Sequence, residues 1–154
     1  MPGPSFAASR LVNPINCASI LTLDQLWKGL SKKERNPELF IPSITSCEVL
    51  SDEGNKLSRD VHFGDKCMRE ELEWHDSTIV YFEMANGTRI TNVVSFNEMN
   101  ELVLTFSFAG GLPPAGFDAD GKAFGAEKLN AIFGGGIDST LRVIREMVKD
   151  GRVF

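Results

Sequence analysis

The chain has 154 residues, a formal net charge of −5 and a sequence pI near 5.1. That length predicts one domain over residues 1–154 that buries roughly 70% of the surface exposed by its unfolded chain. The negative charge and the scattered basic residues argue against a nucleic-acid partner, and the absence of both an apolar run of ~20 residues and a signal-peptide layout predicts a cytoplasmic protein with no membrane partner.

The first elements are a strand and two short helices. A mixed segment over residues 5–12 precedes Asn13-Pro14, which is typical of a strand that ends at a turn. Thr22 and Gln25 have the spacing of a capping box, so a helix should begin at Thr22. Asn36-Pro37 should end or bend that helix, and Pro42 should end a short second helical piece.

The middle of the chain predicts six further strands, which short connections make antiparallel neighbours. Their expected ranges are residues 44–50, 56–63, 66–74, 78–85, 88–96 and 101–108. Asn86-Gly87 is the strongest hairpin signal, because both residues tolerate the positive φ of a type I′ turn.

A long helix is predicted at the carboxyl end. Residues 110–121 are rich in Gly and Pro and read as a loop, whereas residues 124–149 show a helical apolar period. Gly134-Gly135-Gly136 interrupts this helix, and each glycine costs a helix interior about 1 kcal/mol relative to alanine. Something must therefore compensate, or the helix breaks there and a kink opens a portal. Gly151 is expected to act as the carboxyl-terminal cap.

Two charged residues interrupt apolar positions of alternating strands. Arg59 lies among the apolar odd positions of 57–63, and Glu70 among the apolar even positions of 68–74. If Gly64-Asp65 is a two-residue hairpin loop, Arg59 pairs with Glu70 on the inner side of the sheet. Two charges inside a pocket suggest a functional site.

The order of these elements resembles the helix-grip fold of the START and birch-pollen-allergen (SRPBCC) superfamily. The segments Leu21-Thr22-Leu23-Asp24-Gln25-Leu26-Trp27-Lys28-Gly29-Leu30, Arg35-Asn36-Pro37-Glu38 and Phe40-Ile41-Pro42, together with Lys33, are similar to its AtaL-like fungal group. The stretches Thr91-Asn92-Val93-Val94-Ser95 and Leu102-Val103-Leu104-Thr105-Phe106 are also similar. The resemblance implies an α+β fold in which a curved antiparallel sheet of about seven strands wraps around the long helix and encloses a cavity for apolar molecules. The glycine run at 134–136 departs from the pattern and puts that wall of the cavity in doubt.

Such a cavity would be lined by inward-facing side chains, although large apolar residues at these periods are as often plain core. The expected ligand-binding residues are Trp27, Leu57, Val61, Met68, Leu72, Trp74, Phe82, Thr91, Ser95, Leu104, Phe106, Phe133, Ile137 and Leu141. Thr91 and Ser95 face inward only if residues 97–100 form a tight turn. Val80, Phe82 and Met84 face inward with a three-residue loop at 75–77, whereas a two-residue loop at 76–77 would turn Tyr81 and Glu83 inward.

The pair Arg59 and Glu70 has two interpretations. In one, it is a partly buried ion pair that fixes strand register, or a pair at the mouth of the cavity where water reaches both charges. In the other, Glu70 is a general base that takes a proton next to a carbonyl, and Arg59 stabilises the developing enolate.

Other candidate chemistry is weaker. Cys17, Cys47 and Cys67 lack metal-site spacing and read as reduced thiols. His62 should face solvent and His75 should lie in a turn, so no metal site is expected. The leading hypothesis is a cofactor-independent cyclase, isomerase or dehydratase for a polyketide-like or polycyclic molecule, in fungal natural-product biosynthesis. The alternative is a non-catalytic carrier of a hydrophobic small molecule, and either is compatible with a homodimer.

Overall fold

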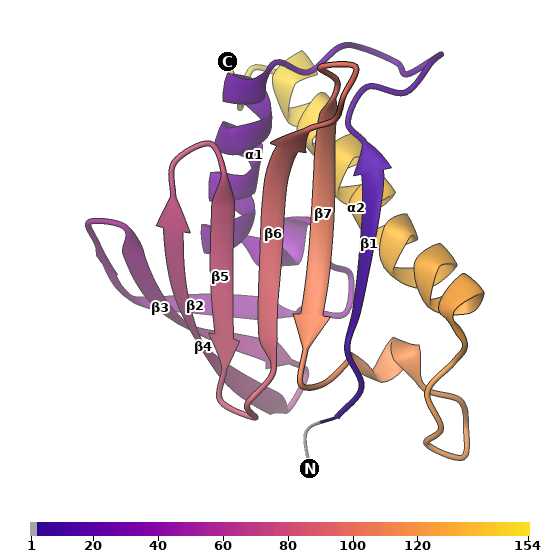
Figure 1. The fold of residues 1–154 in the computed structure, drawn as a ribbon. Coiled ribbons are helices and arrows are strands. Elements are labelled where there is room, and N and C mark those ends of the chain that lie inside the picture. The colour runs from indigo at the N-terminus through magenta and orange to yellow at the C-terminus, as the bar shows by residue number, and fades with distance from the viewer. Residues whose placement is uncertain (1–2) are drawn as a thin grey trace.

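A computed structural model describes residues 3–154 of the chain. Seven strands form one antiparallel sheet in the order β1-β7-β6-β5-β4-β3-β2. The strands are β1 (Phe6–Leu11), β2 (Ser46–Glu53), β3 (Lys56–Phe63), β4 (Lys66–His75), β5 (Ile79–Met84), β6 (Arg89–Phe96) and β7 (Leu102–Ala109). The sheet is strongly curved, since β2 and β3 run across the direction of β6 and β7 (Figure 1). The predicted strands are therefore all present.

The helix α1 (Leu23–Arg35) begins where the capping box predicts. The Thr22 hydroxyl accepts a hydrogen bond from the Gln25 backbone N–H, and the Gln25 side chain accepts one from the Thr22 N–H. The helix ends at Arg35, and the second helical piece is the 3₁₀ helix η1 (Pro37–Leu39). A further 3₁₀ helix, η2 (Pro114–Gly116), lies in the predicted loop before the long helix.

The helix α2 (Ala126–Lys149) runs through the glycine run without a break. Gly134 is needed for a close approach of Arg10 of β1, because a Cβ there would overlap the Arg10 guanidinium. The Arg10 guanidinium donates to the Asn130 carbonyl and side-chain oxygens at 2.9 and 3.0 Å. Gly151 has a φ of +82° just after the helix and so supplies the predicted carboxyl-terminal cap.

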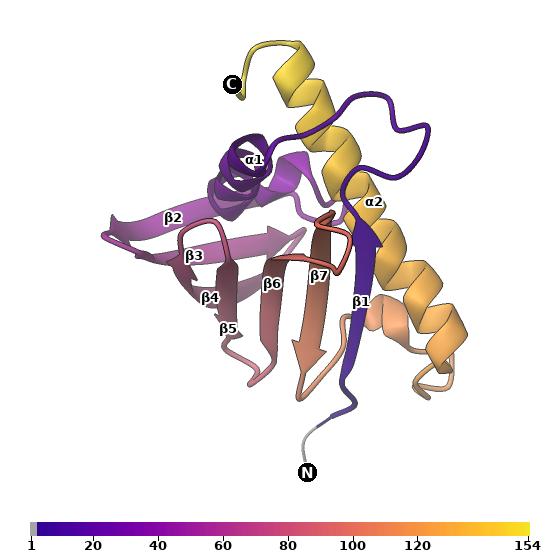
Figure 2. The ribbon, with the colours of Figure 1, turned by 45° about the horizontal axis from the view of Figure 1, so that its top comes forward.

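Both helices lie on the same face of the sheet, which we call the inner face. Phe108 of β7 packs against Phe133 of α2 with ring centroids 4.5 Å apart, and the Lys33 Nζ of α1 lies 4.2 Å from the centroid of Phe106, also of β7. Figure 2 shows α1 above the strands β2 to β5 and α2 beside β1. The long helix therefore covers the β1 edge of the sheet, and α1 covers the half that ends at β2 and also reaches β7.

The inner face carries two groups of buried apolar residues. The larger joins α1 and α2 to β1, β6 and β7, and the smaller lies on β3 to β5 and consists of Leu57, Leu72, Trp74, Val80 and Phe82. Trp27 of α1 contacts both groups. Burial of this kind contributes about 25 cal/mol per Å² of apolar surface, so α1 is held mainly by its apolar stripe.

Two of the predicted hairpins differ from expectation. At Asn86-Gly87 only Gly87 has a positive φ, and Met84 N–H donates to the Thr88 carbonyl, so the loop contains three residues instead of a two-residue type I′ turn. Between β4 and β5 the loop is Asp76 to Thr78, which pairs Trp74 with Val80. That register turns Val80 and Phe82 inward, the face predicted by the three-residue alternative.

The orientation predicted for Thr91 and Ser95 is wrong. Phe96 pairs with Leu102, so the turn between β6 and β7 contains five residues, and not the four expected. The Asn97 side chain accepts hydrogen bonds from the Met99 and Glu101 backbone N–H groups, which draws Glu101 into the turn. One extra residue shifts the strand register by one and reverses every side chain. Thr91 and Ser95 therefore lie on the outer face.

Candidate functional site

Arg59 and Glu70 form a buried ion pair on the inner face. They are register partners on β3 and β4, as the two-residue hairpin at Gly64-Asp65 predicts. The Arg59 Nε and Nη2 lie 2.9 and 2.6 Å from the Glu70 Oε1. The two residues are 4% and 5% exposed, so the pair is deep inside the protein and not at a mouth.

The same guanidinium binds the last turn of α1. The Arg59 Nη1 donates to the backbone carbonyl oxygens of Lys33 at 3.2 Å and of Glu34 at 2.5 Å. Carbonyls in the last turn of a helix have no partner within the helix, and a cation there also complements the helix dipole. Arg59 therefore ties α1 to the sheet and fixes the position of the Glu70 carboxylate.

Only one oxygen of the Glu70 carboxylate accepts hydrogen bonds from the described residues. Both donors of Arg59 end on Oε1, and within residues 3–154 no hydrogen bond ends on Oε2. A carboxylate can accept several hydrogen bonds, and general-base chemistry needs an oxygen within reach of the substrate proton. The Oε2 is the atom that could serve that role.

Lys33 is a second buried charge that the sequence pattern did not select. Its side chain points from α1 toward the inner face of the sheet. The residue is 8% exposed, and its Nζ lies over the Phe106 ring. Burial, and then the nearby Arg59 charge, lower the pKa of Lys33 to about 7. In the sequence, Lys32, Lys33 and Arg35 together suit the negative end of the helix dipole, which gives no reason to single out Lys33. The available signal was spacing, because Lys33 follows Leu26 by seven residues and Leu30 by three.

Glu34 is also buried, at 2% exposure. Burial raises its pKa to about 7, although the neighbouring Arg35 lowers it. Arg35 itself binds both carboxylate oxygens of Asp52 on β2, at 2.8 and 3.0 Å. The last turns of α1 therefore place charged side chains against the sheet, and two of these, Lys33 and Glu34, have pKa values of about 7.

Asn92 takes the inward position that was expected for Thr91. It pairs with Phe106 across β6 and β7 and is 2% exposed. No side-chain hydrogen bond involves its amide among the described residues, although buried amides usually have partners. The signal in the sequence was the alternation of Ile90, Asn92 and Val94, which the assumed turn length obscured.

The other predicted ligand-binding residues divide by element. Leu57, Leu72, Trp74 and Phe82 form the smaller apolar group, and Phe133, Ile137 and Leu141 of α2 join Leu104 and Phe106 in the larger. Val61 is buried, whereas Met68 and Trp27 are half-buried. The structure thus brings these residues to one face, where the guanidinium carbons of Arg59 and Arg35 lie 5.5 and 5.2 Å from the Phe82 and Trp74 ring centroids.

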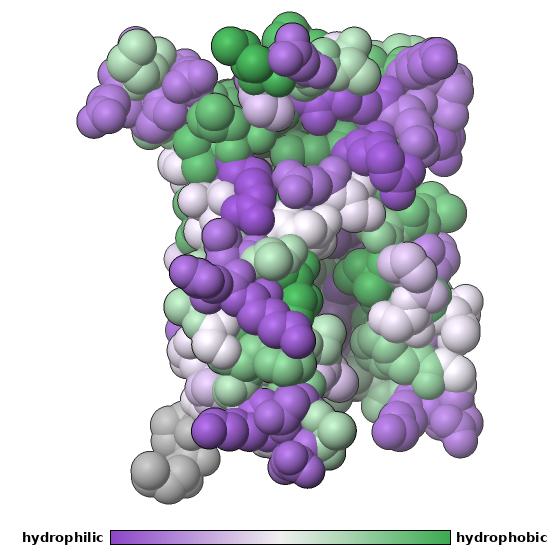
Figure 3. Space-filling view, turned by 90° about the vertical axis from the view of Figure 1, so that its right-hand side faces the viewer, coloured by the Kyte–Doolittle hydropathy of each residue, from purple (hydrophilic) through white to green (hydrophobic). Residues whose placement is uncertain are grey.

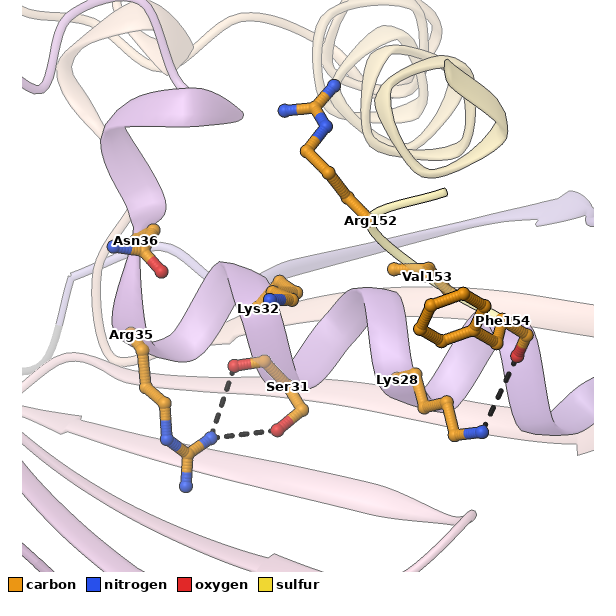
Figure 4. A pocket seen from close by; sticks show the side chains of 8 residues that line it. All are labelled: Lys28, Ser31, Lys32, Arg35, Asn36, Arg152, Val153 and Phe154. Atoms are coloured by element: carbon orange, nitrogen blue, oxygen red, sulfur yellow. Dashed lines mark hydrogen bonds between the residues drawn. The ribbon is translucent and has the colours of Figure 1, made fainter. Parts of the chain in front are cut away.

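Two grooves on the surface lie away from the ion pair. One, of about 340 Å³, lies between α1 and the carboxyl-terminal segment and contains Lys28, Lys32, Arg35 and Arg152 (Figure 4). The other, of about 770 Å³, includes outer-face residues of β4 to β6 such as Glu71, Tyr81 and Arg89 and reaches Leu57 and Leu72. Hydrophobic residues also border a hollow on the side that carries β1 and α2 (Figure 3).

The remaining candidates stand apart from the inner face. His75 is exposed beside the second groove, and His62 is half-buried. Within residues 3–154, no three residues of the His, Cys, Asp and Glu types gather as metal ligands would. The three cysteines are free thiols. None of the described helices is long and apolar enough to cross a membrane.

A comparison with protein families gives one match over nearly the whole chain. The model of AtaL, described as Acetylaranotin biosynthesis cluster protein L, matches residues 6–151. Among curated proteins, none matches this sequence significantly.

Solved structures with the same fold are distant in sequence. StfQ, a di-domain ARO/CYC from the steffimycin biosynthetic pathway, aligns with a TM-score of 0.63 and 13% identity over 96% of this chain and 51% of StfQ, so the chain spans about half the length of that protein. The Zhui aromatase/cyclase from Streptomyces aligns with a TM-score of 0.51 and 13% identity over 92% of this chain and 89% of its own. TTHA0849 from Thermus thermophilus aligns with a TM-score of 0.56 and 19% identity over 96% of this chain and 99% of its own. These likenesses confirm the predicted helix-grip fold.

Proposed function

The chain belongs to the AtaL family, and from that premise we propose that it binds a polyketide-like or polycyclic molecule and catalyses a cofactor-independent cyclisation, isomerisation or dehydration. The setting is a natural-product pathway of a fungus. Residues 1–154 act as one ligand-binding domain, and the ligand lies against the inner face beneath α1.

The observation that carries this proposal is the buried Arg59–Glu70 pair among aromatic side chains. Trp74, Phe82 and Phe106 offer flat apolar surfaces that suit an aromatic or polycyclic ligand. Charged groups are costly to bury, so a pair placed there needs a structural or chemical reason. The biosynthetic character of the AtaL family and the aromatase/cyclase function of two structural neighbours favour a chemical one.

In the proposed mechanism, Glu70 is the acid/base and Arg59 is its positioning residue. The Glu70 Oε2 takes a proton from the carbon between two carbonyls, and the same carboxyl group later returns the proton to an oxygen or carbon. Arg59 holds Oε1, so the carboxylate cannot rotate away. The Asn92 amide donates to the carbonyl oxygen, where negative charge develops as the enolate forms.

A second candidate function is a non-catalytic carrier with the same inner face. It is favoured by the contacts of Arg59, because a guanidinium bound to Glu70 and to two carbonyls of α1 has a sufficient structural role. A carrier would bind the same ligand without changing it.

The test asks whether the protein converts a polyketide-like substrate or only retains it unchanged. The purified protein is incubated with a synthetic poly-β-ketone thioester, and the products are followed by liquid chromatography and mass spectrometry against the spontaneous reaction. We expect cyclised product from the wild type, a loss of at least 100-fold in rate for Glu70→Gln, and little change for Glu71→Gln, the matched exposed control on the same strand. Ligand that co-purifies unchanged, with no product from the wild type, would establish the carrier instead.

A further inference from the structure

Lys33 is largely buried, and its amine, which keeps some contact with solvent, has no acceptor among the described residues. Its residue is 92% removed from solvent, since only 8% is exposed, and within the described residues no hydrogen bond or ion pair involves Nζ. Its neighbour is the Phe106 ring, and Asn92 is the register partner of Phe106 on the next strand. The amine thus lies over an aromatic ring of the inner face whose register partner carries an amide, and neither polar group has a hydrogen-bond partner among the described residues.

The charges that face Lys33 come from three elements. Arg59 on β3 opposes the ammonium form, whereas Glu70 on β4 and Glu34 on α1 favour it. Burial outweighs these attractions, so that the pKa is about 7, against 10.5 for an exposed lysine. A much larger share of Lys33 than of an exposed lysine is therefore unprotonated near pH 7, and only the unprotonated form has a lone pair for attack on carbon.

We propose that Lys33 is a nucleophile in this site and condenses with a ketone carbonyl of the bound molecule to form an imine. The inference deepens the proposed function, on which it rests for the ketone-rich class of ligand. The geometry that supports it is an amine of a largely buried residue, without an acceptor among the described residues, over the Phe106 ring, whose register partner is Asn92.

The steps conserve atoms and electrons. The Nζ lone pair attacks the carbonyl carbon, a C–N bond forms, and a proton passes from nitrogen to oxygen through the Glu70 carboxyl group. The C–O bond then breaks, and water leaves with two hydrogens that began on the amine. A proton then passes from the neighbouring carbon to the imine nitrogen through the Glu70 carboxyl group and gives an enamine. The enamine carbon attacks a second carbonyl and closes a ring, and the nitrogen gives its proton to the new alkoxide, which restores the imine. One water molecule later hydrolyses the imine and restores Lys33.

The experiment traps the imine with a small probe. Folded protein is incubated with pentane-2,4-dione at pH 7 and reduced with sodium borohydride, and the modified lysines are identified by peptide mass spectrometry. We expect Lys33 to be labelled at least tenfold faster than its exposed neighbour Lys32, because an exposed lysine is almost fully protonated at this pH. Lys33→Met should remove the rapid label, and Lys32→Met should leave it unchanged.

Labelling of Lys33 no faster than of Lys32 in the folded protein would overturn the proposal. So would full cyclisation by Lys33→Arg, because arginine keeps the charge and donors but forms no imine. The trapping needs no turnover, so its result is independent of the Glu70 test. Rapid labelling without cyclised product would support Lys33 as a nucleophile and contradict the cyclase function. Cyclised product without rapid labelling would support the cyclase function and contradict the role of Lys33.

Discussion

Arg59 and Glu70 face each other across β3 and β4, and the Arg59 Nη2 lies 2.6 Å from the Glu70 Oε1 in a largely buried site. The guanidinium also accounts for two carbonyl oxygens of α1. One side chain therefore joins two strands and a helix, and it sets how far α1 lies from the sheet. That distance decides how much room a ligand has on the inner face.

Removal of one partner of this pair should cost far more stability than removal of both. Arg59→Met or Glu70→Met alone leaves a buried charge and should lower the free energy of unfolding by about 3–5 kcal/mol. The double variant should be more stable than either single variant. Urea unfolding followed by circular dichroism measures all three.

The matched control is Asp60 and Arg69, register partners on the outer face of the same two strands. Arg69 is exposed, so Arg69→Met should cost much less stability than Arg59→Met. Equal losses at the inner and outer pairs would contradict the buried geometry.

The free energy of unfolding should pass through a minimum near pH 7. Between pH 4.5 and about 7 the folded chain binds an extra proton at Glu34, so its stability falls as pH rises. Above pH 7 the unfolded chain binds an extra proton at Lys33, whose unfolded pKa is near 10.5, so stability rises again. Each slope is at most about 1.4 kcal/mol per pH unit.

Urea unfolding at several pH values from 5 to 9 checks this prediction, with two variants that separate the groups. Glu34→Gln should flatten the acid side, and Lys33→Met should flatten the alkaline side and stabilise the protein at pH 7. A flat profile in the wild type would mean that neither group is buried as described.

The three glycines of α2 should respond differently to alanine. Gly135 and Gly136 have open space where a Cβ would lie, so each alanine should add about 0.5–1 kcal/mol of stability. Gly134→Ala should destabilise, because its Cβ would displace the Arg10 guanidinium and its hydrogen bonds to Asn130. Thermal unfolding of the three variants is the measurement, and a stabilising Gly134→Ala would contradict the contact.

The contact between α1 and α2 depends on Gly29. A Cβ at this position would lie 2.5 Å from the Ile144 Cγ1, so Gly29→Ala should cost about 1–3 kcal/mol through overpacking. Ile144→Ala alone leaves a cavity and should cost about 2–5 kcal/mol. In the double variant the new methyl group enters that space, so its loss should be smaller than the sum. Additive losses in a double-mutant cycle would argue against this packing.

The register of β6 predicts that only one of two adjacent residues affects ligand affinity. Asn92→Ala should weaken ligand binding about fivefold, because it removes an inner-face hydrogen-bond donor worth about 1 kcal/mol. Thr91→Val lies on the outer face and should leave affinity unchanged. Isothermal titration with the cyclised product or a co-purified ligand compares them, and the reverse result would restore the four-residue turn.

Local signals predicted the elements well because each is read from neighbours in the chain. The capping box at Thr22, the hairpin at Gly64-Asp65 and the cap at Gly151 involve residues a few positions apart, and the structure has all three. The orientation of β6 failed because the Asn97 side chain holds one more residue in its turn. A turn length that differs by one residue leaves the hydrophobic pattern almost unchanged but reverses the strand.

The sequence by itself determined the strand order, the long helix and the pairing of Arg59 with Glu70, since alternation and turn residues encode register over short distances. Only the tertiary structure decided what those charges meet. The contacts of Arg59 with the Lys33 and Glu34 carbonyls, and of Lys33 with Phe106, join residues far apart in the chain. They arise because the apolar stripe of α1 packs on a curved sheet, and that packing removes water from a lysine whose place in the sequence looks ordinary.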